Sequence, residues 1–189
     1  MLNFTEFTHM ISNNLPNLEI RFDVPMSRLT SFRIGGPAKC VACPKSEEEL
    51  SMLLKLCAEQ GIEPVILGAG TNVLAPDEGL DRLVIVLKDA LEGMEQIGQT
   101  GIRVMAGVTM SRAAVFAAGL NLGGLEFAHG IPGTVGGGVY MNAGAYGGEM
   151  SQVVRFVRVY NGEEIVDIPG SEMAFAYRHS RAMEENWLI

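Results

Sequence analysis

Apolar residues recur at helical spacing, three or four positions apart, in three parts of the chain. The clearest example is the stripe of Leu50, Leu53, Leu54 and Cys57, which predicts a helix with one buried face. The expected helices run from Asn3 to Asn14, from the start at Ser46 to the stop at Gly61, and from the cap at Thr109 to Ala118, where Gly119 ends the last one.

Polar side chains support the expected helix starts. Ser46 and Glu49 match a capping box, in which the serine oxygen accepts the N–H of Glu49 and the glutamate accepts the N–H of Ser46. Thr109 is an N-cap residue of the same kind.

Short apolar runs bounded by turn residues predict strands, and Asn161-Gly162 between two such runs predicts a hairpin. Strands mixed with helices indicate an α+β or α/β fold. The expected strands are Glu19–Val24, Lys39–Cys43, Pro64–Leu67, Leu83–Leu87, Ile102–Ala106, Val153–Tyr160 and Glu163–Ile168.

The first βαβ-like unit is complete near Lys88, so we expect a division into residues 1–88 and 89–189. The last residues, Trp187-Leu188-Ile189, are an apolar run entering what looks like a strand. Because natural termini are usually polar, this run favours a truncated chain. The alternative is a short C-terminal strand packed on the core.

Composition narrows the classes of function. With 48% hydrophobic and 19% charged residues, the chain has enough apolar residues to form a hydrophobic core and is not expected to be intrinsically disordered. The net charge of -8, without a basic run, disfavours nucleic acid as a partner. The sequence has no bilayer-length apolar stretch, no basic segment before Pro16 and three cysteines, so we expect a cytoplasmic protein without a membrane partner.

Several common catalytic motifs are absent from the sequence, including the nucleotide P-loop, the Gly-x-Ser-x-Gly elbow and His-Glu-x-x-His. Cys40 and Cys43 lie in an extended stretch, where residues three apart face opposite sides, so we interpret them as core residues. The scattered histidines lack the spacing of a zinc site, and we expect no metal.

Glycine is the unusual residue: 11 of the 23 glycines fall between Gly119 and Gly148, among apolar residues. The loop Gly68–Asn72 resembles the opening of a dinucleotide fingerprint, but Val73 replaces the third glycine and no helix is expected after it. Together with a second loop, Gly130–Gly138, it favours a nucleotide cofactor held by main-chain N–H groups. The alternative is a run of tight turns in a glycine-tolerant fold.

Five segments then occur in an order that is specific when taken together. They resemble the UDP-N-acetylenolpyruvoylglucosamine reductase (UDP-N-acetylmuramate dehydrogenase) family, and the resemblance runs from about Val24 to Ile189. The segments are Thr30–Gly36, Leu67–Asn72, Gly130–Gly137, Met141–Gly147 and Phe175–Ser180.

The resemblance implies an α+β protein with α/β-type subdomains and the FAD-binding fold of the vanillyl-alcohol oxidase and p-cresol methylhydroxylase type. Residues 1–88 and 89–189 would then be the two FAD-binding subdomains. In the family, NADPH reduces FAD, and the flavin reduces UDP-N-acetylenolpyruvoylglucosamine to UDP-N-acetylmuramate for peptidoglycan. A third, substrate-binding domain carries the proton-donating serine, and we expect it to be absent here, so that this chain alone has little or no activity.

The resemblance also implies roles for particular residues. Arg178 matches the catalytic arginine, and Tyr177 helps to position the UDP-sugar substrate. Read without the resemblance, Arg178 is a solvated surface residue. The residues expected to bind the cofactor are Gly68, Ala69, Gly70, Thr71, Asn72, Gly130, Ile131, Pro132, Gly133, Thr134, Gly136, Gly137, Asn142, Ala143, Gly144, Ala145, Tyr146 and Gly147.

Two other functions remain open from the sequence. One is a different flavin oxidoreductase of the same fold, and the other is a non-catalytic nucleotide-binding or interaction module. The sequence indicates no obligatory protein partner.

Overall fold

A computed structural model describes residues 4–189. The chain divides into two compact units, one that ends at Leu91 (unit 1) and one that spans Glu92–Ile189 (unit 2). Each unit has its own hydrophobic core. The assignment of the two parts as FAD-binding subdomains stays a prediction.

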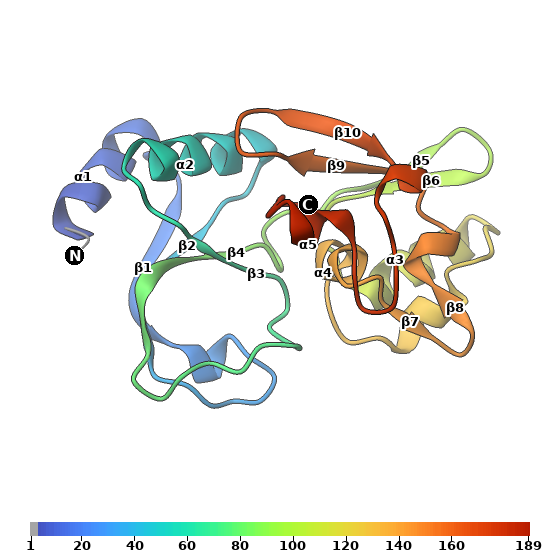
Figure 1. The fold of residues 1–189 in the computed structure, drawn as a ribbon, viewed down its shortest axis with the longest axis horizontal. Coiled ribbons are helices and arrows are strands. Elements are labelled where there is room, and N and C mark those ends of the chain that lie inside the picture. The colour runs from blue at the N-terminus through green and yellow to red at the C-terminus, as the bar shows by residue number, and fades with distance from the viewer. Residues whose placement is uncertain (1–3) are drawn as a thin grey trace. The chain divides into compact units, whose positions relative to one another are not determined.

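Unit 1 is built on a four-stranded sheet (Figure 1). The strands Glu19–Pro25 and Pro37–Cys43 pair antiparallel. The strand Leu80–Val86 pairs in parallel with Pro37–Cys43 on one side and with Val65–Leu67 on the other. The crossover between the second and third strands in the sequence is helix α2 (Glu47–Glu59), and helix α1 (Phe4–Asn14) precedes the sheet. In spatial order the strands are β1 (Glu19–Pro25), β2 (Pro37–Cys43), β4 (Leu80–Val86) and β3 (Val65–Leu67).

The predicted elements of unit 1 are confirmed with small shifts at their ends. The predicted stripe of α2 is buried, with Leu53 and Cys57 at 0% and 1% exposure. Gly61 follows the end of α2 with φ +62°, a backbone conformation that favours glycine. The expected first residue of α1, Asn3, lies outside the described residues.

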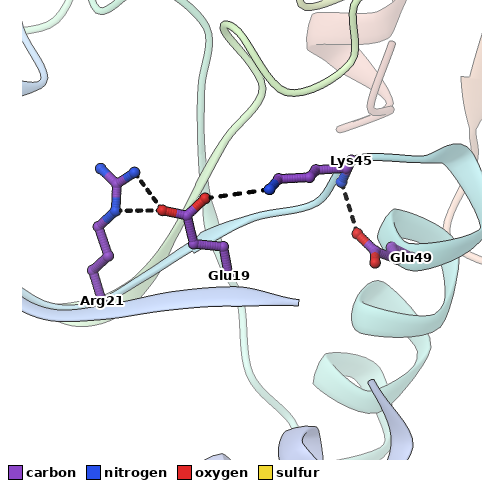
Figure 2. A network of polar contacts seen from close by, with 4 residues as sticks. All are labelled: Glu19, Arg21, Lys45 and Glu49. Atoms are coloured by element: carbon purple, nitrogen blue, oxygen red, sulfur yellow. Dashed lines mark hydrogen bonds and ion pairs between the residues drawn. The ribbon is translucent and has the colours of Figure 1, made fainter. Parts of the chain in front are cut away.

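The capping box at the start of α2 is only half present. Ser46 Oγ accepts the N–H of Glu49 at 3.2 Å, as predicted. The Glu49 carboxylate instead accepts the N–H of Lys45 at 2.7 Å, one residue before the predicted donor (Figure 2). The prediction of the helix start was right, and the prediction of the second cap bond was wrong.

Figure 2 also shows that Lys45 joins this cap to the edge strand β1. Its Nζ lies 3.8 Å from Glu19 Oε2, while the other carboxylate oxygen, Glu19 Oε1, accepts from Arg21 Nε at 2.8 Å. The hydrogen bond and the charge of Arg21 lower the pKa of Glu19. Because all of these groups face solvent, the network adds little to stability.

Unit 2 contains three two-stranded sheets and three α-helices in its described residues 92–189 (Figure 1). The sheets pair β5 (Met94–Ile97) with β6 (Gly101–Val104), β7 (Gly144–Ala145) with β8 (Gly148–Glu149), and β9 (Phe156–Tyr160) with β10 (Ile165–Pro169). The helices are α3 (Met110–Gly119), α4 (Val135–Tyr140) and α5 (Arg181–Glu184).

The core of unit 2 gathers buried side chains from most of these elements, including Met110, Phe127, Val139, Val159 and Met173. Helix α3 and strand β6 confirm predictions, while β5, α4, α5 and the β7–β8 pair were not expected. The predicted end of α3 was early by one residue. Gly119 belongs to the helix, and the left-handed conformation falls on Asn121, at φ +56°.

The predicted hairpin is present, with a longer loop than its Asn-Gly pair suggested. Tyr160 pairs with Ile165, so the loop has four residues, Asn161–Glu164. The Asn161 side chain closes the turn, because its Oδ1 accepts the N–H groups of Glu163 and Glu164 at 2.9 Å each. The strand before the loop begins at Phe156 and not at Val153, since a short 3₁₀ turn occupies Met150–Gln152.

Leu188 forms an antiparallel bridge with Tyr160, through N–H···O bonds of 2.8 and 3.1 Å. Trp187 and Ile189 on either side of it pack against the core of unit 2. The apolar run at the end of the chain therefore lies beside the strand β9.

Candidate functional site

The loop Gly68–Asn72 follows β3 in unit 1 and is attached to residues 29–31. Ser31 N–H donates to the carbonyl oxygen of Gly70 at 3.0 Å, a contact that uses none of the loop's own N–H groups. Gly70 has φ +63°, and a Cβ there would lie 2.1 Å from the carbonyl oxygen of Leu29. The fold of unit 1 therefore requires glycine at this position whether or not a ligand binds.

The rest of this loop is open to solvent to different degrees. Asn72 is exposed, whereas Gly68, Ala69 and Thr71 are half-buried. Within the described residues 68–79 the chain forms no helix, which confirms that this is not a Rossmann turn. If a nucleotide phosphate binds at this loop, its partners would be main-chain and side-chain groups of the loop, because no helix begins there to offer its N-terminus.

The second glycine loop leads into helix α4 in unit 2, and much of its main chain is already hydrogen-bonded. Val135 N–H donates to Val108 O at 2.8 Å and Gly136 N–H donates to Ala106 O at 3.0 Å. The N-cap residue Thr134, which is 2% exposed, accepts the N–H of Gly137 at 3.4 Å. The sequence suggested that the main-chain N–H groups of this loop bind a cofactor. Three of these N–H groups, those of Val135, Gly136 and Gly137, instead form hydrogen bonds within unit 2.

Two glycines of α4 allow close packing. A Cβ at Gly136 would lie 2.8 Å from the Cβ of Ala106, and one at Gly138 would lie 2.7 Å from Met110 Sδ. Gly133 is required for another reason, since its φ of +146° is a conformation that L side chains rarely adopt. A side chain at Gly133 or Gly136 would therefore disturb unit 2 itself, whereas one at Gly138 would displace the flexible end of Met110.

Gly130 and Gly137 are different, because their missing side chains leave open space. A Cβ at Gly130 would meet nothing within 4 Å. A Cβ at Gly137 would meet only Thr134 Oγ1, at an ordinary contact distance of 3.5 Å, and Gly137 is exposed. These two residues present bare backbone at the surface, which is the feature that a closely approaching flat cofactor requires.

The segment Asn142–Gly147 continues from α4 into the short hairpin of β7 and β8. Tyr146 and Gly147 form its two-residue turn, with φ values of +52° and +84°. Positive φ at both central residues is characteristic of a type I′ turn. The turn places the Tyr146 ring, 97% exposed, at the tip of the hairpin.

Tyr177 and Arg178 occupy the tip of a second tight turn. Ala176 and His179 exchange two N–H···O bonds of 3.2 Å across it. Tyr177 is 93% exposed, and Arg178 is exposed with φ +57°, a strained conformation for a residue with a side chain. The turn therefore directs a phenol and a guanidinium away from the core of unit 2.

Buried polar contacts connect this turn to the end of α4. Asn142 Nδ2 donates to Ala176 O at 3.1 Å, and Ser180 Oγ donates to Tyr140 O at 2.8 Å. Unit 2 thus brings the Asn142–Gly147 segment and the Tyr177–Arg178 turn together. Ser180 was not among the residues that sequence reasoning assigned to the site, although it closes the Phe175–Ser180 segment that carried the resemblance.

The cysteines and possible metal ligands contribute no chemistry to this arrangement. Burial raises the pKa of the Cys40 thiol to about 11 and that of Cys57 to about 12, so both are protonated and unreactive at neutral pH. Across residues 4–189, no cluster of three His, Cys, Asp or Glu side chains could hold a metal ion. In the same described range, each helix is too short or too polar to cross a bilayer.

The chain is similar in sequence to curated proteins. The UDP-N-acetylenolpyruvoylglucosamine reductases of Pseudothermotoga lettingae and Clostridioides difficile are each 41% identical to the chain, over 172 and 169 residues. The match covers 90% and 89% of this chain and 58% and 55% of those proteins. The chain spans little more than half the length of these relatives.

Solved structures agree with the sequence comparison. UDP-N-acetylenolpyruvylglucosamine reductase from Thermus caldophilus matches with a TM-score of 0.72 and 29% identity, over 91% of this chain and 59% of that one. Alkyldihydroxyacetonephosphate synthase matches with a TM-score of 0.66, covering 89% of this chain and 36% of its own, but at 13% identity it shows the fold alone.

The profile of the FAD binding domain family matches residues 38–167, which is more than half of the chain. The predicted fold, family resemblance and cofactor class are confirmed by these matches. The chain therefore belongs to the FAD binding domain family, as a homologue of UDP-N-acetylenolpyruvoylglucosamine reductase with the α+β fold of the vanillyl-alcohol oxidase and p-cresol methylhydroxylase type.

Proposed function

We propose that this chain is the FAD-holding part of a reductase that converts UDP-N-acetylenolpyruvoylglucosamine to UDP-N-acetylmuramate with NADPH. The observation that carries the proposal is the bare, exposed backbone at Gly137, in a chain of the FAD binding domain family. Gly130 has the same open space and supports it. When bound and reduced by NADPH, FAD would supply the hydride that reduces the enolpyruvyl double bond.

In this proposal Arg178 acts on the substrate carboxylate. Hydride addition to an enolpyruvyl group builds negative charge on the adjacent carboxylate system. A guanidinium presents parallel N–H donors that match a carboxylate, and its charge persists at all physiological pH values. A donor group held in place before the reaction stabilises such charge without the cost of reorganising.

Tyr177 precedes Arg178 at the tip of the same turn and has its ring exposed. We assign it to holding the sugar nucleotide near the guanidinium. The proton donor, and the rest of the substrate site, belong in this proposal to the part of the relatives that this chain does not cover. The cytoplasmic location stays a prediction.

The proposal is tested at Gly137. Gly137→Ala places a methyl group on the bare backbone without a clash inside the protein, so unit 2 is expected to stay folded. Alanine is also the better helix former, by about 1 kcal/mol. FAD affinity is expected to fall, because the methyl group occupies the space that the cofactor approaches; fluorescence quenching during FAD titration measures it.

Gly119→Ala is the matched control, because Gly119 is also helical and has nothing within 4 Å of its Cβ position. It should gain the same helix preference and keep the FAD affinity of the unmodified chain. Equal FAD affinity in the Gly137 and Gly119 variants would refute the assignment of Gly137. A chain that takes up no FAD at all would favour a module without flavin.

A further inference from the structure

Asn142 has a buried side chain whose nitrogen and oxygen each form a hydrogen bond within unit 2. It is 4% exposed. Its Nδ2 donates to Ala176 O at 3.1 Å, and its Oδ1 accepts the N–H of Ser151 at 2.9 Å. One amide therefore joins the end of α4 to two segments that follow it by 9 and 34 residues.

The main chain of Asn142 is also specialised. Its φ is +45°, a left-handed conformation that asparagine tolerates better than most residues with a side chain. Its N–H donates to Val139 O at 3.1 Å, which attaches it to the last turn of α4. The residue thus fits this position by its backbone and by having a donor and an acceptor on one short side chain.

The contact to Ala176 falls at the base of the Tyr177–Arg178 turn. Ala176 and His179 pair across that turn, and Arg178 has φ +57°. Such a strained conformation persists only where the surroundings enforce it. Ser180, which is 0% exposed, supplies a second contact on the other side through its 2.8 Å bond to Tyr140 O.

We propose that Asn142 is a positioning residue, which fixes the Tyr177–Arg178 turn on the end of α4 and does not bind the cofactor through its side chain. The inference rests on the proposed function, because positioning Arg178 matters only if Arg178 meets the substrate anion. It changes the expectation for Asn142 from a cofactor ligand to a support of the arginine turn. Residues Ala143–Gly147 keep their expected place along the flavin.

The decisive variant is Asn142→Asp. Aspartate tolerates the left-handed conformation and can still accept the N–H of Ser151, but as a carboxylate it has no hydrogen to donate to Ala176 O. We expect amide exchange at Ala176 and His179 to become about fivefold to tenfold faster, the factor that one lost hydrogen bond of ordinary strength produces. The order parameters of Tyr177 and Arg178 should fall, while the Ser151 amide keeps its protection.

Asn161→Asp is the matched control. Asn161 lies in the β9–β10 loop of the same unit, and only its acceptor oxygen is used in the bonds to Glu163 and Glu164. Aspartate preserves that acceptor, so this variant should leave exchange at Ala176 and His179 unchanged. Ser180→Ala is a second variant, expected to loosen the turn without any change at Ser151.

Heteronuclear NMR of the chain without FAD measures the amide exchange and the order parameters. FAD titration of the same samples measures the FAD affinity. Selective loosening of residues 176–179, with unchanged FAD affinity, is the expected result. Unchanged exchange at those residues, faster exchange throughout unit 2, or weaker FAD binding with an intact turn would each overturn the inference. If no sample binds FAD, the proposed function fails, and the exchange data still decide whether Asn142 holds the turn.

Discussion

Glycine occupies the different positions of the two loops for different physical reasons, although the sequence does not distinguish these positions. Gly70 is required by its positive φ and by the carbonyl oxygen that its Cβ would strike. Gly136 is required because Ala106 packs directly on its backbone, whereas the neighbour of Gly138 is the flexible end of the Met110 side chain. At Gly130 and Gly137 a Cβ would not clash with any part of unit 2, so these two loop residues carry the argument for a ligand.

At the same scale, Arg178 combines an exposed charge with a strained backbone. Arg178→Ala and Arg178→Gly both remove the guanidinium, and they differ only in how readily the residue adopts φ +57°. We expect the glycine variant to be more stable by about 1 kcal/mol, the usual cost of a left-handed conformation for a residue with a Cβ. Urea denaturation of the two variants measures this difference directly.

Both variants should keep FAD binding, because neither touches the bare backbone at Gly137. Loss of FAD in proportion to loss of fold in both would mean that Arg178 is structural. Equal stability of the two variants would contradict the strain that the turn imposes on this residue.

Among the elements that the sequence did not predict, α4 carries the candidate site residue Gly137. Its sequence, Val-Gly-Gly-Gly-Val-Tyr, opposes a helix, since each glycine costs about 1 kcal/mol relative to alanine. The helix forms because its first N–H groups donate to the carbonyl groups of Ala106 and Val108 and to the cap Thr134. Tertiary contacts outweigh helix propensity here, and no local pattern reveals them.

The cap of α4 gives a prediction for this element. Thr134→Ala removes the oxygen that accepts the N–H of Gly137, and we expect a loss of about 1 kcal/mol in stability. FAD affinity should fall as well, because the first turn of α4 carries the exposed Gly137. Calorimetric unfolding and FAD titration are the measurements.

Thr134→Ser retains the hydroxyl oxygen and is the control for this prediction. It should recover most of the stability and of the FAD affinity. A serine variant as impaired as the alanine variant would show that the methyl group of Thr134 matters and the cap does not.

Elements with a local signal were predicted well. The apolar stripe and Ser46 located α2, and Asn161-Gly162 located the β9–β10 hairpin. The details that failed depend on competing partners: Glu49 bonds to Lys45 N–H, and the Asn161 side chain closes a four-residue loop. A local pattern identifies the residues able to make a bond, while the geometry of the folded chain selects the partner.

For the whole molecule, membership of the FAD binding domain family predicts that the cofactor stabilises the folded chain. A ligand that binds only the folded state adds about 2.7 kcal/mol when its concentration is 100 times its Kd. We therefore expect the midpoint of thermal unfolding to rise steadily with FAD concentration. Scanning calorimetry over a series of FAD concentrations measures the rise.

The Gly137→Ala variant should need a higher FAD concentration for the same rise, which connects the whole-molecule effect to a single residue. Riboflavin, which lacks the diphosphate and adenosine, is the control ligand and should stabilise less. An unfolding midpoint that is independent of FAD concentration would contradict cofactor binding by this chain.

The sequence by itself determined the family, the cofactor class, the mixed α/β character and the elements whose apolar spacing or caps are local. It also indicated the segments that carry Gly137 and Arg178, because short motifs in a fixed order can be identified without knowledge of the fold. The tertiary structure alone decided which glycines face a neighbour and which face open space, and that the Asn142 side chain points inward to the arginine turn. Those properties depend on contacts between residues far apart in the sequence, such as Tyr140 and Ser180, which are 40 positions apart, and no spacing along the chain encodes them.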